Sequence, residues 1–126
     1  MKKYVLILIP LFFFSCRKEV PDELFDFVGD YHLFYTQLSS VDYWVQDDLD
    51  FSVGLRVRDN MSIETFVDGK RFKRYKYLKV RNNSGLSIEA IYEADFKRNV
   101  HFIFYKNGRI ETKEFPFPNE INIFKK

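Results

Sequence analysis

The chain has 126 residues, which suits one compact domain of ordinary size. It has 20 basic and 18 acidic residues, and aromatic residues make up 19% of it. Lys2 and Lys3 are the only charged residues before Cys16, so the chain from Cys16 onward has 18 charges of each sign and is formally neutral. This balance argues against nucleic acid as a partner, because binding to nucleic acid depends on an excess of basic charge.

The first 15 residues have the layout of a secretory signal. Lys2 and Lys3 form a positive start, and the apolar run Tyr4–Phe14 follows them. As a helix of about 1.5 Å per residue, this run would reach only about 16 Å, against a hydrocarbon core of about 30 Å. Pro10 would also kink such a helix. A signal is therefore favoured over a membrane-spanning anchor.

The segment Phe13-Phe14-Ser15-Cys16 resembles the lipobox of bacterial lipoproteins, in which a small residue precedes a cysteine that is acylated. The resemblance implies cleavage before Cys16, a lipid on its sulfur and attachment to a membrane of the cell envelope. Cys16 is the only cysteine, and lipidation would use a thiol that has no disulfide partner. The alternative is an ordinary secretory signal that happens to contain a cysteine. Arg17 stands where an aspartate would resemble an inner-membrane retention signal, which favours the outer membrane.

Three segments are predicted: a lipoprotein signal peptide at 1–15, a lipidated tether at 16–23 and a β domain at 24–126. The tether is polar and contains Pro21. At the start of the domain, residues 22–28 can form one or two helical turns that end at Gly29. The apolar side of these turns is expected to carry Leu24, Phe25 and Val28.

From residue 31 onward the sequence alternates with a period of two, which is typical of strands. The alternating runs are Tyr31–Thr36, Phe51–Val57, Ile63–Val67, Leu86–Tyr92 and Glu120–Phe124. Turn-forming residues separate the runs at Asp59-Asn60, Asp68-Gly69, Asn82–Gly85 and Asn107-Gly108. The pattern predicts an all-β fold, an antiparallel up-and-down meander of about eight strands that forms a barrel or half-barrel.

Two of the turns predict strand register. A three-residue loop at 59–61 with a bulge would pair Val57 with Ile63 and Arg56 with Glu64, which keeps apolar and polar faces apart.

At the other turn, a two-residue loop Asn107-Gly108 would pair Tyr105 with Ile110 and His101 with Glu114.

The tripeptide Gly29-Asp30-Tyr31 resembles the Gly-x-Trp opening of lipocalin-like domains, with Tyr31 in place of tryptophan. The resemblance implies an eight-stranded barrel whose mouth can accept one small apolar ligand. An eight-stranded interior is either filled by side chains or occupied by one ligand. The many Phe and Tyr residues favour filling.

The stretch Lys70–Arg81 interleaves basic and aromatic residues more densely than any other part of the chain. A regular strand would place on one face the residues Arg71, Lys73, Tyr75, Tyr77, Lys79 and Arg81. Such a face could bind phosphates of lipopolysaccharide, an acidic glycan or an acidic partner. The alternative is a solvated strand whose lysines prevent edge pairing and whose Lys73 meets Glu64 across the Asp68-Gly69 turn.

Tyr43 and Trp44 lie in a polar connection, 37–50, that also contains four aspartates, Asp42, Asp47, Asp48 and Asp50. Exposed aromatic residues in a loop anchor glycan or protein partners, but the same two rings can also fold back as a lid on the core. The aspartates lack the ordered spacing and the glycine of an EF-hand loop, so no metal is expected.

His32 and His101 are the only histidines, and no GxSxG nucleophile motif is present. We therefore expect a binding or scaffold module without enzymatic activity or cofactor, held at the membrane, with a protein, glycan or lipid partner. Two alternatives stay open: a carrier of a small apolar ligand, and an immunity-type inhibitor of an envelope toxin.

Overall fold

The structure, a computed structural model, describes residues 20–38 and 42–126. Nine strands are assigned in this part of the chain: β1 (Gly29–Leu38), β2 (Asp42–Val45), β3 (Val53–Val57), β4 (Ile63–Val67), β5 (Lys70–Asn83), β6 (Ser87–Glu93), β7 (Asn99–Tyr105), β8 (Ile110–Thr112) and β9 (Ile121–Lys125). Three short 3₁₀ elements accompany them: η1 (Asp22–Phe27), η2 (Gln46–Asp48) and η3 (Asp95–Lys97).

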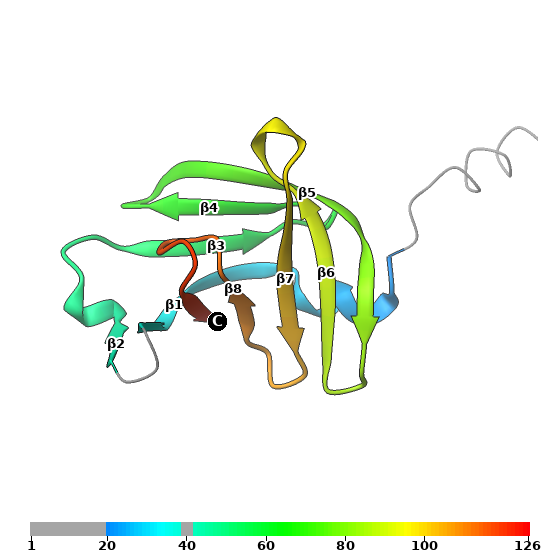
Figure 1. The fold of residues 1–126 in the computed structure, drawn as a ribbon, viewed down its shortest axis with the longest axis horizontal. Coiled ribbons are helices and arrows are strands. Elements are labelled where there is room, and N and C mark those ends of the chain that lie inside the picture. The colour runs from blue at the N-terminus through cyan, green and yellow to red at the C-terminus, as the bar shows by residue number, and fades with distance from the viewer. Residues whose placement is uncertain (1–19, 39–41) are drawn as a thin grey trace, which may run out of the picture.

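The strands form a closed barrel (Figure 1). β1 pairs with β3, each strand from β3 to β8 pairs with the next, and β9 returns to pair with β1, always antiparallel. The barrel therefore has eight strands, β1 and β3–β9, in up-and-down order, as the alternation predicted. The lipocalin-like expectation of an eight-stranded barrel is confirmed, and the sheet is closed.

The ninth strand, β2, lies outside the barrel order. It pairs with the second half of β1, at Tyr35–Leu38, while the first half of β1 pairs with β3. The segment 37–50 was predicted to be a polar connection, but it contains β2 and η2. The prediction was wrong here because β3 pairs only with the first half of β1, so the second half has an edge with which Asp42–Val45 can pair as a strand.

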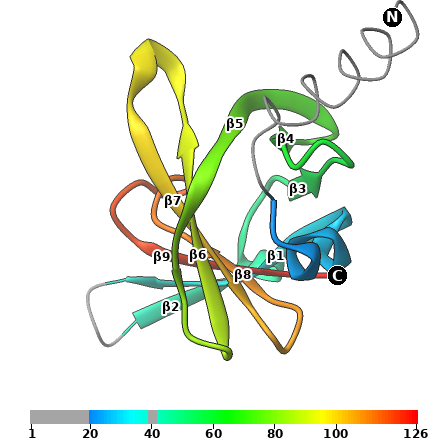
Figure 2. The same cartoon turned by 90° about the vertical axis from the view of Figure 1, so that its right-hand side faces the viewer.

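β5 forms a corner of the barrel (Figure 2). Its first half pairs with β4 as far as Tyr75, and its second half pairs with β6 from Lys76 onward. Register shifts leave Phe72, Leu78 and Arg81 as extra residues. Such bulges bend a strand and increase its twist, which lets one strand serve two parts of the barrel.

The β3–β4 loop has the predicted register. Val57 lies opposite Ile63 and Arg56 lies opposite Glu64. Met61 closes the loop with a φ of +67°, which is the left-handed position that a three-residue hairpin loop requires.

The predicted β7–β8 register is wrong by one residue. Phe104 pairs with Ile110 and Phe102 with Thr112, so the loop has three residues, and His101 does not face Glu114. The His101 ring instead lies beside Glu89 of β6, with Nδ1 2.6 Å from a carboxylate oxygen. In the observed register the buried residues of β7 and β8 both face the interior of the barrel. This burial favours the three-residue loop over the predicted two-residue loop.

Aromatic side chains fill the barrel. Neighbouring rings pack edge to face, with centroids 5.2 Å apart for Tyr75 and Phe102 and 5.1 Å apart for Tyr92 and Phe102. The hydroxyl of Tyr92 donates to the carbonyl of Met61 at 2.8 Å, which satisfies its polar end inside the core. Burial raises the pKa of this phenol far above its usual value.

The element η1 covers one end of the barrel. A 3₁₀ helix has three residues per turn, so Leu24 and Phe27 share a face, and both are buried. Phe27 packs on Phe104 with 5.1 Å between ring centroids, and the Tyr31 hydroxyl donates to its carbonyl at 2.8 Å. The expected burial of Phe25 was wrong, since an α-helical spacing does not apply, and Phe25 is 45% exposed.

Every buried residue among those described lies between Leu24 and Phe124. The strands that close the barrel, β1 and β9, lie within the same limits. Residues 20–126 therefore contain every strand of the closed barrel and the whole core of the described chain, and we expect this range to fold as a self-contained unit.

Asn122 of β9 lies at the closure, with Thr36 of β1 on one side and Thr112 of β8 on the other. It is fully buried. Its side-chain oxygen accepts from the Thr36 hydroxyl at 2.9 Å, and its amide donates at 3.0 Å to the carbonyls of Thr112, Phe117 and Glu120.

We predict that Asn122→Ala lowers the free energy of unfolding by about 2–3 kcal/mol, because it leaves several buried polar groups without a partner. Urea unfolding followed by circular dichroism measures this. Asn99→Ala is the matched control, since Asn99 is exposed and its side chain makes no recorded hydrogen bond in the described chain. Equal stability of the two variants would contradict the assigned role of Asn122.

Candidate functional site

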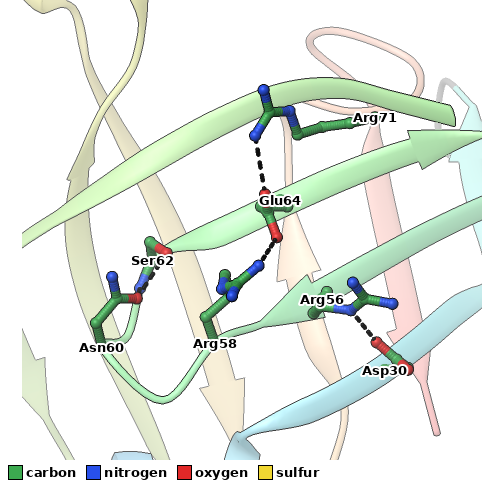
Figure 3. Close-up of polar contacts among 7 residues, drawn as sticks. All are labelled: Asp30, Arg56, Arg58, Asn60, Ser62, Glu64 and Arg71. Carbon is green, nitrogen blue, oxygen red and sulfur yellow. Dashed lines mark hydrogen bonds and ion pairs between the residues drawn. The ribbon is translucent and has the colours of Figure 1, made fainter.

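The outer face of β4 carries a shielded carboxylate, Glu64, between two arginines (Figure 3). Its oxygens accept from Arg58 at 2.9 Å and from Arg71 at 3.2 Å. The Glu64 side chain is only 6% exposed, while the two arginine side chains are about half exposed. The hydrogen bond from Arg58, aided by that from Arg71, holds the pKa of Glu64 below its usual range. Two cations on one carboxylate leave this cluster with a positive charge.

Neighbouring contacts hold this cluster in place. In the β3–β4 loop, Asn60 Oδ1 accepts from the Ser62 amide at 3.0 Å and from its hydroxyl at 2.7 Å (Figure 3). On β3, Arg56 donates to Asp30 at 2.6 Å and lies over the Phe66 ring, 5.0 Å from its centroid. The outer face of β3 and β4 is thus a fixed array of paired charges.

β5 differs from its neighbours in carrying unpaired cations. Within residues 20–38 and 42–126 no ion pair is formed by Lys70, Arg74, Lys76, Lys79 or Arg81. All five are exposed. The positive charge of this strand is therefore available to a partner.

The predicted single face of β5 is wrong. Tyr75 and Tyr77 point into the barrel and are buried, so they belong to the core and not to a binding surface. A bulge shifts the inward–outward alternation of a strand by one residue, and β5 has one bulge before the two tyrosines, at Phe72, and one after them, at Leu78. The same strand therefore has tyrosines inside the barrel and cations outside it.

Arg71 and Lys73, two further residues of the predicted face on β5, have different partners from those expected. Arg71 binds Glu64, whereas Lys73 does not. Because Phe72 is an extra residue, Lys73 lies opposite Thr65, and its ammonium is 5.7 Å from the centroid of the Phe72 ring. Tyr43 and Trp44 lie on β2, and their side chains are outside the described part of the structure.

The β6–β7 hairpin ends in a protruding tip, η3, that the sequence reasoning missed (Figure 1). Phe96 at this tip is fully exposed, at 102% of the reference area. It has a φ of +60° and Lys97 has a φ of +57°, a strained conformation for residues other than glycine. The signal available in the sequence was a lone phenylalanine in the polar segment 95–98.

The tip lies at the same end of the barrel as the first half of β5, in both views (Figures 1 and 2). A cavity of about 910 Å³ lies between the β6–β7 tip, the first half of β5 and the start of the described chain. Its lining includes Val20, Phe25, Arg74, Lys76 and Asp95.

A second cavity, of about 720 Å³, lies on the other side of η1. Phe27, Tyr31 and Phe104 supply its apolar wall. Arg109 and Lys125 also line it, and both of these cations lie over the Phe34 ring, 4.7 and 4.1 Å from its centroid.

The described residues do not contain a group of three or more His, Cys, Asp or Glu side chains that could hold a metal ion. Asp48 instead accepts a hydrogen bond from the Val45 amide at 3.1 Å, which stabilises the local turn. Among the same residues no helix is long and apolar enough to cross a membrane.

The fold and surface define a closed eight-stranded up-and-down β barrel with an aromatic core and a strand of unpaired cations. No protein-family model, curated protein or solved structure matches the chain.

We predict that Glu64→Gln lowers the free energy of unfolding at neutral pH by about 1 kcal/mol, because an amide cannot neutralise two guanidinium groups. Since the pKa of Glu64 is lowered in the folded state, its contribution is present above the ordinary value of 4.5 and is lost as the pH falls through the lowered pKa. Urea unfolding across this range should show a larger loss for the wild type than for the variant.

Glu23→Gln is the control for this experiment, because Glu23 is exposed and forms no ion pair among the residues described. If Glu64→Gln has the same acid dependence as the wild type, the two arginines do not stabilise the carboxylate.

Proposed function

We propose that the chain is a lipid-anchored protein of the bacterial cell envelope and that its barrel is a binding module without enzymatic activity. One observation carries the proposal: the only cysteine, Cys16, directly follows a short apolar run and a small residue, Ser15. Segments 1–15, 16–23 and 24–126 are then signal, tether and β domain. Arg17 favours the outer membrane.

The arrangement of the barrel supports a surface function. Side chains such as Tyr75, Tyr92 and Phe102 occupy the interior and are almost fully buried. The polar pairs of the outer face, such as Arg58 with Glu64, link strands to each other. The unpaired cations of β5 and the fully exposed Phe96 at the β6–β7 tip are prominent among the side chains outside these contacts, so a partner is expected to bind there.

We predict that Cys16→Ala releases the protein from membranes, because two or more acyl chains give stable attachment and this variant has no site for them. The measurement is fractionation of host cells followed by a high-salt wash, together with incorporation of radiolabelled palmitate. Ser15→Ala is the matched control, since it keeps a small residue before the cysteine and should remain labelled and membrane-bound. A Cys16→Ala protein that stays with washed membranes would refute the anchor.

A carrier of a small amphiphilic ligand is the second candidate, favoured by the cavity of about 720 Å³ beside η1. Its apolar wall, with Phe27 and Phe104, and its cations Arg109 and Lys125 suit an apolar compound with an anionic group.

For this candidate we predict that native mass spectrometry of the protein from its own host detects a bound anionic amphiphile, and that Arg109→Glu reduces its retention, because a carboxylate then replaces a cation of the cavity wall. Arg81→Glu, exposed on β5 and outside this cavity, is the control. A consistently empty wild-type protein would reject the carrier function.

A further inference from the structure

The end of the barrel formed by the β6–β7 tip and the adjoining part of β5 has three features that point to the same partner. We name it the tip surface and define it by Phe96, Lys97, Arg74 and Lys76. We propose that the tip surface rests on an anionic lipid bilayer, with Phe96 in the interfacial layer and the cations at lipid phosphates. The inference rests on the proposed function in one respect, since the anchor is what brings the bilayer close.

The first feature is the exposed ring of Phe96. It is the most exposed of the large apolar side chains in the described chain, and it gains no burial within the fold. The turn around it closes tightly, because the Ala94 amide donates to the Arg98 carbonyl at 2.7 Å. The backbone thus holds the ring outward at the end of a hairpin. Aromatic residues flanked by Lys or Arg favour the membrane interface.

The second feature is the position of the tether. Val20 lines the same cavity as Arg74, Lys76 and Asp95, the last of which begins the tip. Val20 follows Cys16 by only four positions. A fully extended chain of that length spans at most about 14 Å. A lipid on Cys16 would therefore keep this end of the barrel close to the bilayer surface.

The third feature is charge. Arg74, Lys76 and Lys97 form no ion pair in the described part of the chain, whereas Arg98 is paired with Glu114. Asp95 is the acidic residue of the tip itself.

Two further acidic residues, Asp59 and Glu93, line the cavity next to the tip surface, and Glu93 lies opposite Lys76, so three nearby carboxylates balance the three cations in number. We therefore expect Phe96 to supply much of the binding and the cations to select anionic over neutral lipid. Each cation near an anionic surface strengthens binding roughly fivefold.

The opposite end of the barrel provides matched controls. Leu86, in the β5–β6 loop, is 76% exposed, and Lys106, in the β7–β8 loop, is exposed without an ion pair among the residues described. These two loops lie at the end away from the β6–β7 tip (Figure 1). They carry the same kinds of side chain, and the tether residue that lines a cavity with them is Glu23, which is three positions further from Cys16 than Val20 is.

The test uses the self-contained folding unit 20–126, which has no Cys16. The fragment is sedimented with vesicles of phosphatidylethanolamine and phosphatidylglycerol, and with vesicles of phosphatidylcholine alone. We expect partition into the anionic vesicles only, weakened by salt. Phe96→Ala and Lys97→Gln should each reduce the partition coefficient roughly fivefold. Leu86→Ala and Lys106→Gln should leave it unchanged, and circular dichroism checks that all four variants fold.

Three results would overturn the proposal: no partition of the wild-type fragment, equal partition into phosphatidylcholine, or equal losses for the control variants. Selective binding of the wild-type fragment to a protein partner, with no vesicle binding, would also reject the bilayer as the occupant. The vesicle test does not depend on lipidation. A negative vesicle result would therefore not contradict the lipid anchor, and a negative Cys16→Ala result would not contradict vesicle binding.

Discussion

The pairing of β1 with β9 is the constraint on which the rest of this structure depends. It places Asn122 between Thr36 and Thr112 in the interior, where every polar atom of its side chain has a partner. Closure removes the free edges that an open sheet of this length would expose. It also limits the interior of an eight-stranded barrel to what side chains can fill, and here aromatic rings fill it.

Closure also determines where charge can lie. β5 turns the corner between two parts of the barrel, and its bulges keep Tyr75 and Tyr77 inside while Arg74 and Lys76 face solvent. Glu64 of β4 partly neutralises Arg58 and also Arg71 of β5. Arg74 and Lys76 of β5 form no ion pair in the described chain, so one strand supplies both core packing and exposed positive charge.

Because side chains fill the interior of the barrel, a partner is expected to bind to its outer face or its loops. Val20, where the described chain begins, lines a cavity together with Asp95 of the β6–β7 tip, so the anchor we propose would act on the part of the molecule that carries the exposed aromatic tip. Attachment by a short tether raises the local concentration of the bilayer at that end, so contacts that are weak in free solution become significant there. The opposite end, with the β5–β6 and β7–β8 loops, would then face away from the membrane (Figure 1).

The sequence by itself determined the period of the strands, the places of the turns after β3, β4, β5 and β7, and the position of Cys16 after a short apolar run. It also determined the β3–β4 register, because Val57 and Ile63 are apolar while Arg56 and Glu64 are charged, so only one register separates the faces. These are local properties of the chain, and they can be read without knowing what packs against them.

Only the tertiary structure decided which face of an ambiguous strand lies inside. On β7, Val100, Phe102 and Phe104 alternate with His101, Ile103 and Tyr105, and both sets are substantially apolar, so alternation does not distinguish a two-residue from a three-residue loop. The burial of Tyr75 on β5 was decided in the same way. The physical reason is that periodicity along a strand is local, whereas its inward direction depends on strands that are distant in sequence and meet only when the barrel closes.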